Sequence, residues 1–266
     1  MNRKVSLKPV QGYNKVFNAG ELDMRCTQFG LIRLAKGTVY EDNTKESEVA
    51  LVLIGGNFAA KGEGWAFEVT DGRASPFTGK PHLLYLPRRT KYVITALSDV
   101  ELAYNGAPVT RDTAKPTLVR PEQTKHLDIG RDNFFRTSEV MLDETFDSEN
   151  FYIGEGMIPN GNWSGYPPHK HDETNPPAEL DMEETYFYLF DPPQGFGFQA
   201  VYKADGSVNE GYRVQAYDTV AIADGYHPLV GAPGYDMYYL WTMAGKQGRG
   251  LKSSMDPKHT WTLEKK

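Results

Sequence analysis

The fold is best inferred from one stretch of the chain, which begins Tyr166-Pro167-Pro168-His169-Lys170-His171-Asp172 and ends at His227. Side chains alternate along an extended strand, so its first two histidines point to one side and the lysine between them points to the other. A glutamate opens a later aromatic strand. Three imidazoles and one carboxylate suit a borderline divalent ion such as zinc, iron, manganese or nickel. The stretch therefore predicts a metal site whose ligands are His169, His171, Glu184 and His227.

Composition limits the classes of protein to which the chain can belong. Its 266 residues, of which 39% are hydrophobic, are enough for one large or two ordinary globular domains. A net charge of -6 and the lack of any Lys/Arg-rich block argue against a nucleic-acid-binding surface. No apolar run has the length of a secretion signal or a membrane span, and the single cysteine, Cys26, allows no internal disulfide. We expect a cytoplasmic protein with no membrane partner.

Short apolar and aromatic runs, separated by Gly, Asp and Pro, recur along the chain and are typical of strands and turns. The predicted strands cover 30–34, 49–54, 64–69, 82–87, 92–97, 100–104, 134–142, 150–158, 184–189, 196–202, 212–215, 219–222 and 235–243. Between Ala107 and Arg136 the composition shifts toward Pro, Thr and Lys, which is typical of a segment that connects two domains. We expect an all-β fold with an N-terminal barrel at 1–107, a connecting strap at 108–128 and a C-terminal barrel at 129–266.

The two parts of the chain resemble copies of one another. An offset of 136 residues sets the strand that begins at Glu48 against the one that begins at Glu184, and it sets Leu84–Pro87 against Val220–Ala223. The first part contains a single histidine, His82, and cannot supply three imidazoles. We therefore expect a metal-free, structural N-terminal barrel and a functional C-terminal one.

A His-x-His pair, a Glu on the next strand and a later His resemble the two-motif signature of the cupin superfamily, a small antiparallel jelly-roll barrel. Further sequence motifs resemble those of the 5-deoxy-glucuronate isomerase family of myo-inositol catabolism: Gly195-Phe196-Gly197-Phe198-Gln199, Gly225-Tyr226-His227-Pro228, Ala232-Pro233-Gly234-Tyr235-Asp236 and Asp256-Pro257-Lys258-His259-Thr260-Trp261. The resemblance implies a bicupin, that is, two tandem jelly-roll barrels. The chain departs from the family pattern at Tyr217, Ala223 and Trp241, none of which is a predicted ligand.

The resemblance also implies a reaction, the aldose–ketose isomerisation of 5-deoxy-D-glucuronate to 5-dehydro-2-deoxy-D-gluconate through a metal-stabilised enediolate. Zinc suffices because the metal need not change its redox state, although manganese, iron or nickel would fit the same ligands. The acid and base are open, and Tyr186, Gln199 and Tyr238 are candidates because their strands could line the barrel. Arg136 is the candidate for binding the substrate carboxylate.

Two points remain open from sequence alone. Glu183 is the rival of Glu184 as a ligand, and strand alternation favours Glu184, since it shares a face with Tyr186 and Tyr188. Other functions also fit the ligand set: the related uronate isomerase of pectin breakdown, a cupin dioxygenase, or a non-catalytic sugar-binding cupin. For the assembly we expect a homo-oligomer, and specifically a dimer, because two-fold homodimers are the commonest assemblies.

Overall fold

The described part of the chain is built from antiparallel β-sheet. The computed structural model describes residues 2–112, 114–245 and 247–264. Within these ranges, helix is limited to three short 3-10 turns, η1 (Pro121–Gln123), η2 (Asp132–Phe134) and η3 (Thr260–Leu263). None of them approaches the length and apolarity that a membrane-crossing helix needs. The predicted all-β class is confirmed.

Two sheets form what we call the N-terminal half. The larger has six strands in the spatial order β11 (Thr117–Val119), β8 (Leu83–Leu86), β5 (Ser47–Gly55), β10 (Val100–Pro108), β3 (Gln28–Leu34) and β2 (Gly12–Phe17). The smaller has four strands in the order β4 (Val39–Asn43), β9 (Lys91–Ala96), β6 (Phe58–Gly62) and β7 (Trp65–Val69).

Three sheets form what we call the C-terminal half. Seven strands lie in the order β1 (Lys4–Ser6), β20 (Asp218–Ile222), β17 (Glu183–Asp191), β22 (Asp236–Ala244), β14 (Phe151–Ile158), β13 (Arg136–Leu142) and β12 (Lys125–Ile129). Four strands lie in the order β15 (Trp163–Ser164), β21 (Leu229–Gly231), β18 (Phe196–Tyr202) and β19 (Asn209–Gln215). The last sheet pairs β16 (His169–Lys170) with β23 (Ser254–Met255).

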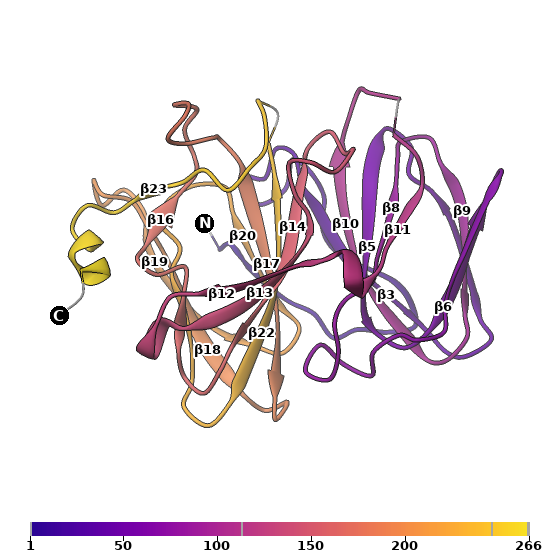
Figure 1. The fold of residues 1–266 in the computed structure, drawn as a ribbon, viewed down its shortest axis with the longest axis horizontal. Coiled ribbons are helices and arrows are strands. Elements are labelled where there is room, and N and C mark those ends of the chain that lie inside the picture. Colours follow the sequence, from indigo (N-terminus) through magenta and orange to yellow (C-terminus); the bar gives the residue numbers. More distant parts are fainter. Residues whose placement is uncertain (1, 113, 246, 265–266) are drawn as a thin grey trace.

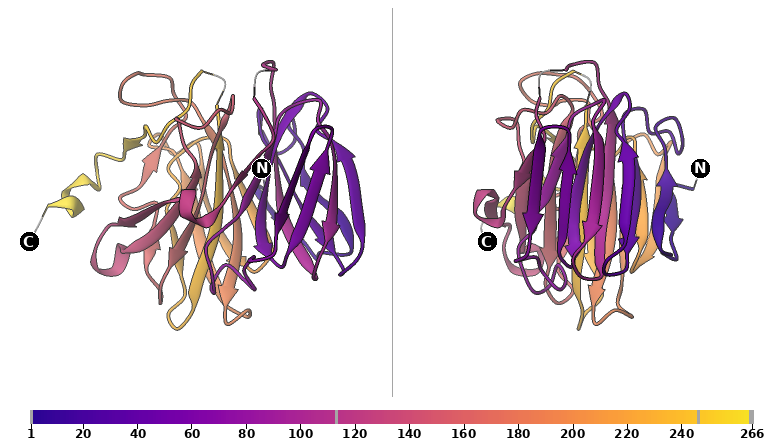
Figure 2. Two further views of the ribbon diagram at one scale, coloured as in Figure 1. Left: turned by 45° about the vertical axis from the view of Figure 1, so that its right-hand side comes forward. Right: turned by 90° about the vertical axis from the view of Figure 1, so that its right-hand side faces the viewer.

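The large sheets of the two halves lie side by side, and β5 and β17 are buried on both faces (Figures 1 and 2). Odd-numbered residues of β5 such as Val49 and Leu51 pack inside the N-terminal half, whereas Ala50 and Val52 pack in a core shared by both halves. On β17, Phe187 belongs to the shared core. Burial on two faces explains why these strands read as uninterrupted apolar runs rather than as alternating ones.

The internal repeat is present in the strand pairing, but its predicted register is wrong by one residue on one strand. Glu48 pairs with Ala107 of β10, and Glu183 pairs with Ala244 of β22. Both carboxylates face the opposite half, so Glu48 matches Glu183, and Val49 stands where the C-terminal half has Glu184. A one-residue slip moves every side chain to the other face of a strand, which is why the difference matters. The predicted match of Leu84–Pro87 with Val220–Ala223 agrees with the pairing, because Leu86 lies opposite Val49 and Ile222 opposite Glu184.

The structure departs from the predicted division of the chain in two places, the N-terminal segment and the strap at 108–128. Lys4–Ser6, assigned by the sequence to the N-terminal barrel, forms the edge strand β1 on β20 of the C-terminal half. The predicted strap contains two strands, of which β11 pairs with β8 and β12 pairs with β13. The chain therefore crosses between the halves twice: the N-terminal segment supplies an edge strand to the C-terminal half, and the strap supplies one edge strand to each half.

A buried ion pair joins the halves and should contribute strongly to stability. Arg73 donates to both oxygens of Glu155 at 2.7 and 2.8 Å, and both residues are buried. Arg73→Met would leave the Glu155 carboxylate buried without its partner, so the free energy of unfolding should fall by about 3–5 kcal/mol. Urea denaturation measures this loss. Arg89→Met is the control, because Arg89 and its partner Glu46 are exposed and such pairs contribute about 1 kcal/mol or less; equal losses in the two variants would contradict the prediction.

Candidate active site

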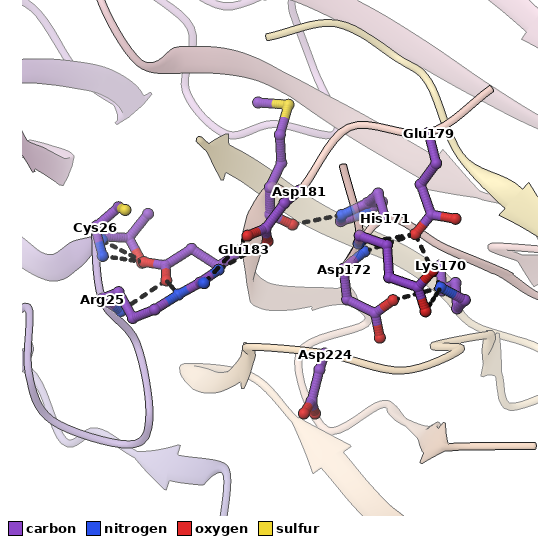
Figure 3. Close-up of polar contacts among 12 residues, drawn as sticks. Arg25, Cys26, Lys170, His171, Asp172, Glu179, Asp181, Glu183 and Asp224 are labelled. Carbon is purple, nitrogen blue, oxygen red and sulfur yellow. Dashed lines mark hydrogen bonds and ion pairs between the residues drawn. The ribbon is translucent and has the colours of Figure 1, made fainter. Parts of the chain in front are cut away.

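Three histidines converge from two segments far apart in the sequence. His169 lies in β16, His171 follows it directly, and His227 lies in the turn after β20. Their potential ligand nitrogens all lie within 4.8 Å of one another. The ring centroid of His227 is 4.9 Å from that of each of the others. Lys170 forms an ion pair with Asp172 at 2.6 Å (Figure 3), whereas His169 and His171 both point toward His227, so the two histidines share one side of the segment.

Glu184 completes the group. Its Oε2 atom lies 3.1 Å from the Nε2 atoms of both His171 and His227. The neighbouring Glu183 points in the opposite direction, where its carboxylate accepts hydrogen bonds from backbone amides of residues 25–27 (Figure 3). Of the two adjacent glutamates, only Glu184 therefore faces the histidines, as strand alternation predicts.

Backbone carbonyls orient two of the imidazoles. The Nδ1 atom of His171 lies 2.5 Å from the carbonyl oxygen of Met182, and that of His227 lies 2.8 Å from the carbonyl oxygen of Gly225. A carbonyl can only accept, so each Nδ1 carries the proton and each Nε2 offers a lone pair toward Glu184 when the ring is neutral. The Nε2 atom of His227 is buried and, despite its proximity to the carboxylate, has no hydrogen-bond partner. This unpartnered atom fits a position that a bound cation would complete.

The charge states of Glu184 and His169 agree with a ligand set. Burial raises the pKa of the Glu184 carboxyl, but the neighbouring His171 and His227 together outweigh it and lower the pKa to about 2. Burial and the neighbouring histidines lower the pKa of His169 to about 3. Burial also lowers the pKa of His171, but the hydrogen bond and the charge of Glu184, together with the Met182 carbonyl, outweigh this and raise it. At neutral pH the group thus contains an ionised carboxylate and a neutral His169, the states in which these side chains bind metals.

A cavity of about 250 Å³ opens onto the group. Its polar wall includes His169, His171, Glu184, Arg136, Tyr186, Ser164 and Tyr239. Its apolar wall includes Leu127, Ile129, Trp241 and Met243, and the segment of Leu251, Lys252, Ser253 and Met255 forms part of the rim. A cavity with a few convergent polar groups and an apolar wall is typical of small-molecule sites.

Arg136 is a buried cation in this cavity without an acidic partner. It is only 9% exposed, and its Nη1 atom donates to the carbonyl oxygens of Phe134 and Tyr166 at 3.1 and 3.3 Å. Its Nε atom has no hydrogen-bond partner, and no acidic side chain among the described residues forms an ion pair with it. Burial lowers the pKa of the guanidinium. A buried arginine with an unused donor is well suited to bind an anionic ligand.

The three predicted acid/base candidates separate in the structure. Tyr186 lines the cavity, with its ring centroid 5.9 Å from that of His227, and burial together with the charge of Glu184 raises its pKa well above 10. Gln199 is not among the described residues that line the cavity, since its amide donates to the carbonyl oxygen of His227 and it accepts from Tyr188. Tyr238 lies in the shared core, where its hydroxyl donates to Glu155 at 2.9 Å.

Among the cavity residues on β22 that were missed as site candidates are Tyr239 and Trp241. Tyr239 hydrogen-bonds through its hydroxyl to Ser164 at 2.7 Å, and Trp241 stacks on Tyr152 with a centroid distance of 5.8 Å. Both face the cavity because they alternate with Tyr238, which faces the other half. Strand alternation groups Tyr239 with Trp241, but only the pairing of Trp241 with Tyr186 in the structure shows that their shared face is the cavity face. The departure from the family pattern at Trp241 therefore lies in the cavity wall.

Comparison with known sequences identifies relatives over most of the chain. The KduI/IolB family model matches residues 9–262. A 5-deoxy-glucuronate isomerase of Geobacillus kaustophilus is 38% identical over 241 residues, which cover 90% of this chain and 86% of the relative. A 5-deoxy-glucuronate isomerase of Bacillus subtilis (strain 168) is 37% identical over 246 residues, which cover 91% of this chain and 90% of the relative.

Solved structures give the same result at the level of the fold. An IolB-like protein of Salmonella typhimurium LT2 has a TM-score of 0.94 at 29% identity, covering 99% of this chain and 100% of that one. An oxalate decarboxylase of Lactobacillus farciminis has a TM-score of 0.70 at 13% identity, covering 97% of this chain and 89% of that one. The second likeness concerns the fold alone, and it confirms the predicted bicupin architecture. From the family match and the curated relatives together, the chain belongs to the KduI/IolB family.

Proposed function

We propose that this protein is a 5-deoxy-glucuronate isomerase, an aldose–ketose isomerase of myo-inositol catabolism that forms 5-dehydro-2-deoxy-D-gluconate. One observation carries the proposal: a cluster of three histidines and one glutamate opens, through His169, His171 and Glu184, onto a cavity that also holds a buried arginine without an acidic partner among the described residues. The substrate has an aldehyde beside a hydroxyl at one end and a carboxylate at the other. The histidine–glutamate cluster matches the aldehyde end, and Arg136 matches the carboxylate end. The relatives described above carry the same name.

His169, His171, Glu184 and His227 would hold one divalent ion. The unpartnered Nε2 of His227, the neutral His169 and the ionised Glu184 support this assignment. Zinc fits three nitrogens and one oxygen, as would manganese, iron or nickel. When bound, the ion would supply Lewis acidity at the carbonyl oxygen of the substrate.

The protein side chains would bind the substrate and control one proton. Arg136 binds the carboxylate, and the apolar wall that includes Trp241 and Met243 limits the access of water to the reacting carbons. Tyr186 stays protonated at neutral pH because burial and Glu184 raise its pKa. It therefore acts as a donor toward the substrate oxygen that gains negative charge when the C2 proton leaves.

Tyr186→Phe tests this role. It removes the hydroxyl and leaves the ring, so we expect kcat to fall by about 100-fold, the lower range for general acid catalysis, while zinc affinity is unchanged. Tyr238→Phe is the matched comparison, because its hydroxyl lies at the ion pair between the halves and outside the cavity. Steady-state kinetics on metal-loaded protein measure both. Full activity of Tyr186→Phe, or an equal loss in Tyr238→Phe, would contradict the assignment.

The choice of reaction is tested by comparing substrates. Metal-loaded protein is incubated separately with 5-deoxy-glucuronate and with 5-dehydro-4-deoxy-uronate, the substrate of the uronate isomerase of pectin breakdown, and oxygen uptake is recorded. We expect ketose formation from the first at a kcat/KM at least about tenfold higher than from the second, without oxygen uptake. Faster turnover of the second substrate would assign the pectin reaction, and oxygen uptake would assign a dioxygenase.

We also propose a cytoplasmic homodimer. The buried state of Cys26 agrees with a compartment in which disulfides do not form. Two-fold dimers are the commonest assemblies of soluble proteins, and light scattering of the purified protein tests the subunit number.

A further inference from the structure

Four consecutive residues, Asp181–Glu184, link the N-terminal half to the histidine cluster, and Figure 3 shows Asp181 and Glu183 between the segment of Arg25 and Cys26 and His171. Two of them face the cluster: Glu184 through its carboxylate, and Met182 through its carbonyl oxygen, which accepts from Nδ1 of His171. The other two, Asp181 and Glu183, contact the segment of residues 25–27 in the N-terminal half. The same short segment thus contacts a predicted ligand on one side and the opposite half on the other.

Glu183 is held by a set of converging donors. Its Oε1 atom accepts from the backbone amides of Cys26 and Thr27 at 2.6 and 2.5 Å and from the Thr27 hydroxyl at 2.9 Å. Its Oε2 atom accepts from the backbone amide of Arg25 at 2.6 Å. The side chain is fully buried. Three successive amides aimed at one carboxylate form an anion-binding concavity, and here the anion is a side chain from the other half.

The donor segment is itself fixed on both sides. The Arg25 guanidinium makes two hydrogen bonds to the carboxylate of Asp181, at 2.8 and 3.1 Å. The segment then leads directly into β3, where the ring of Phe29 packs against that of Phe187 of β17 in the shared core, with a centroid distance of 5.6 Å. Contacts at Asp181, Glu183 and Phe187 therefore bind the start of β17 to the N-terminal half.

We propose that Glu183 is a positioning residue through which the N-terminal half aligns the metal centre. Its contacts with residues 25–27 hold the backbone of β17 where Glu184 and the Met182 carbonyl reach His171. The inference rests on the metal centre of the proposed function. It gives the metal-free half a role in the affinity of the site, in addition to its contribution to folding.

The chain supplies a matched control in Glu48, the repeat equivalent of Glu183. Glu48 is buried and accepts from the backbone amides of Glu149 and Asn150, at 2.9 and 2.8 Å, and from the Tyr85 hydroxyl at 2.7 Å. Glu48 thus reaches from the N-terminal half to backbone amides of the C-terminal half, whereas Glu183 reaches from the C-terminal half to amides of the N-terminal half. The next residue, however, is Val49, a core side chain, where the C-terminal half has Glu184.

The test compares Glu183→Gln with Glu48→Gln in the full-length protein. Glutamine has the shape of glutamate but turns an N–H group toward a donor, so both variants should unfold at lower temperature. Zinc affinity is measured by competition with a chelator, well below the unfolding midpoint. We expect Glu183→Gln to bind zinc about 10- to 100-fold more weakly, as for other residues that support metal ligands, and Glu48→Gln to bind it as the unmodified protein does. Saturating zinc should restore kcat to Glu183→Gln.

The outcomes separate this inference from the proposed function. If the unmodified protein binds zinc and Glu183→Gln binds it equally well, or if both variants weaken binding alike, Glu183 is a stability residue and the inference is wrong. If the unmodified protein binds no divalent ion, the metal centre itself fails, and the inference with it. Thr27→Val, which removes only the hydroxyl donor to Glu183, is the second variant should Glu183→Gln not fold. We expect it to weaken zinc binding by about 3-fold, and unchanged binding would count against the inference.

Discussion

His169→Ala should lose both its metal and its activity. One of three imidazoles is removed from a group whose nitrogens lie within 4.8 Å of one another, and alanine offers no replacement donor. A bound metal ion lowers the activation barrier by several kcal/mol because it stabilises the charge that develops on the substrate. We therefore expect kcat/KM for 5-deoxy-glucuronate to fall by about 1000-fold or more. Elemental analysis after gel filtration should show the zinc content falling from about one ion per chain to a small fraction. Kinetics and elemental analysis on the same sample measure the two effects together.

His126→Ala is the control for this variant. His126 is also a histidine on a strand of the C-terminal half, but it is exposed and hydrogen-bonds to Glu139 outside the cavity. It should keep full zinc content and activity. An active His169→Ala protein with its metal retained would show that the ion, if it acts at all, is bound elsewhere.

Arg136→Met should lose most of the preference for an acidic substrate. The guanidinium is buried in the cavity and has no acidic partner in the described part of the chain, so the substrate carboxylate would be its counter-ion. Removing one partner of a buried, hydrogen-bonded charge pair costs about 2–5 kcal/mol, which corresponds to a fall in kcat/KM of about 30- to 5000-fold. Because the carboxylate is remote from the reacting carbons, most of the change should appear in KM.

A matched substrate makes this prediction specific. 5-Deoxy-D-glucose keeps the aldehyde and the C2 hydroxyl but carries an uncharged group in place of the carboxylate. The unmodified protein should strongly prefer the acid, and Arg136→Met should turn over the two substrates at similar rates, as a double-mutant cycle requires for a direct contact. The variant should fold, because removal of the Arg136 guanidinium leaves no protein carboxylate without a partner. Equal losses on both substrates would show that Arg136 supports the cavity without binding the carboxylate.

Much of the site could be predicted because its residues obey strand alternation. His169 and His171 flank a lysine, and an extended backbone places both on one side whatever else the chain does. The same rule separates Glu184 from Glu183, since Glu184 shares a face with Tyr186. Long apolar runs such as Val49–Ile54 predicted strands correctly, because a strand buried on both faces must be apolar throughout.

The same double burial explains what could not be predicted. On β22 both faces are apolar, so hydrophobicity does not reveal which of Tyr238 and Tyr239 faces the cavity. The repeat alignment erred for a related reason, since Glu48 was matched to a ligand when its carboxylate faces the other half. The donors to Glu183 are backbone amides, which leave no trace in sequence. Edge strands such as Val39–Asn43 are short and polar, and their pairing is set by the neighbouring strand.

The most direct test of the account is NMR of the zinc-loaded protein incubated with 5-deoxy-glucuronate in deuterated water. Removal of the C2 proton and its return at C1 from a group in exchange with solvent should place deuterium in the product. We expect the aldehyde signal to be replaced by that of the 2-deoxy-5-keto acid, with deuterium incorporated, and no conversion by His169→Ala. No conversion by protein that contains a full complement of zinc would contradict the substrate assignment and leave the histidine cluster to another reaction.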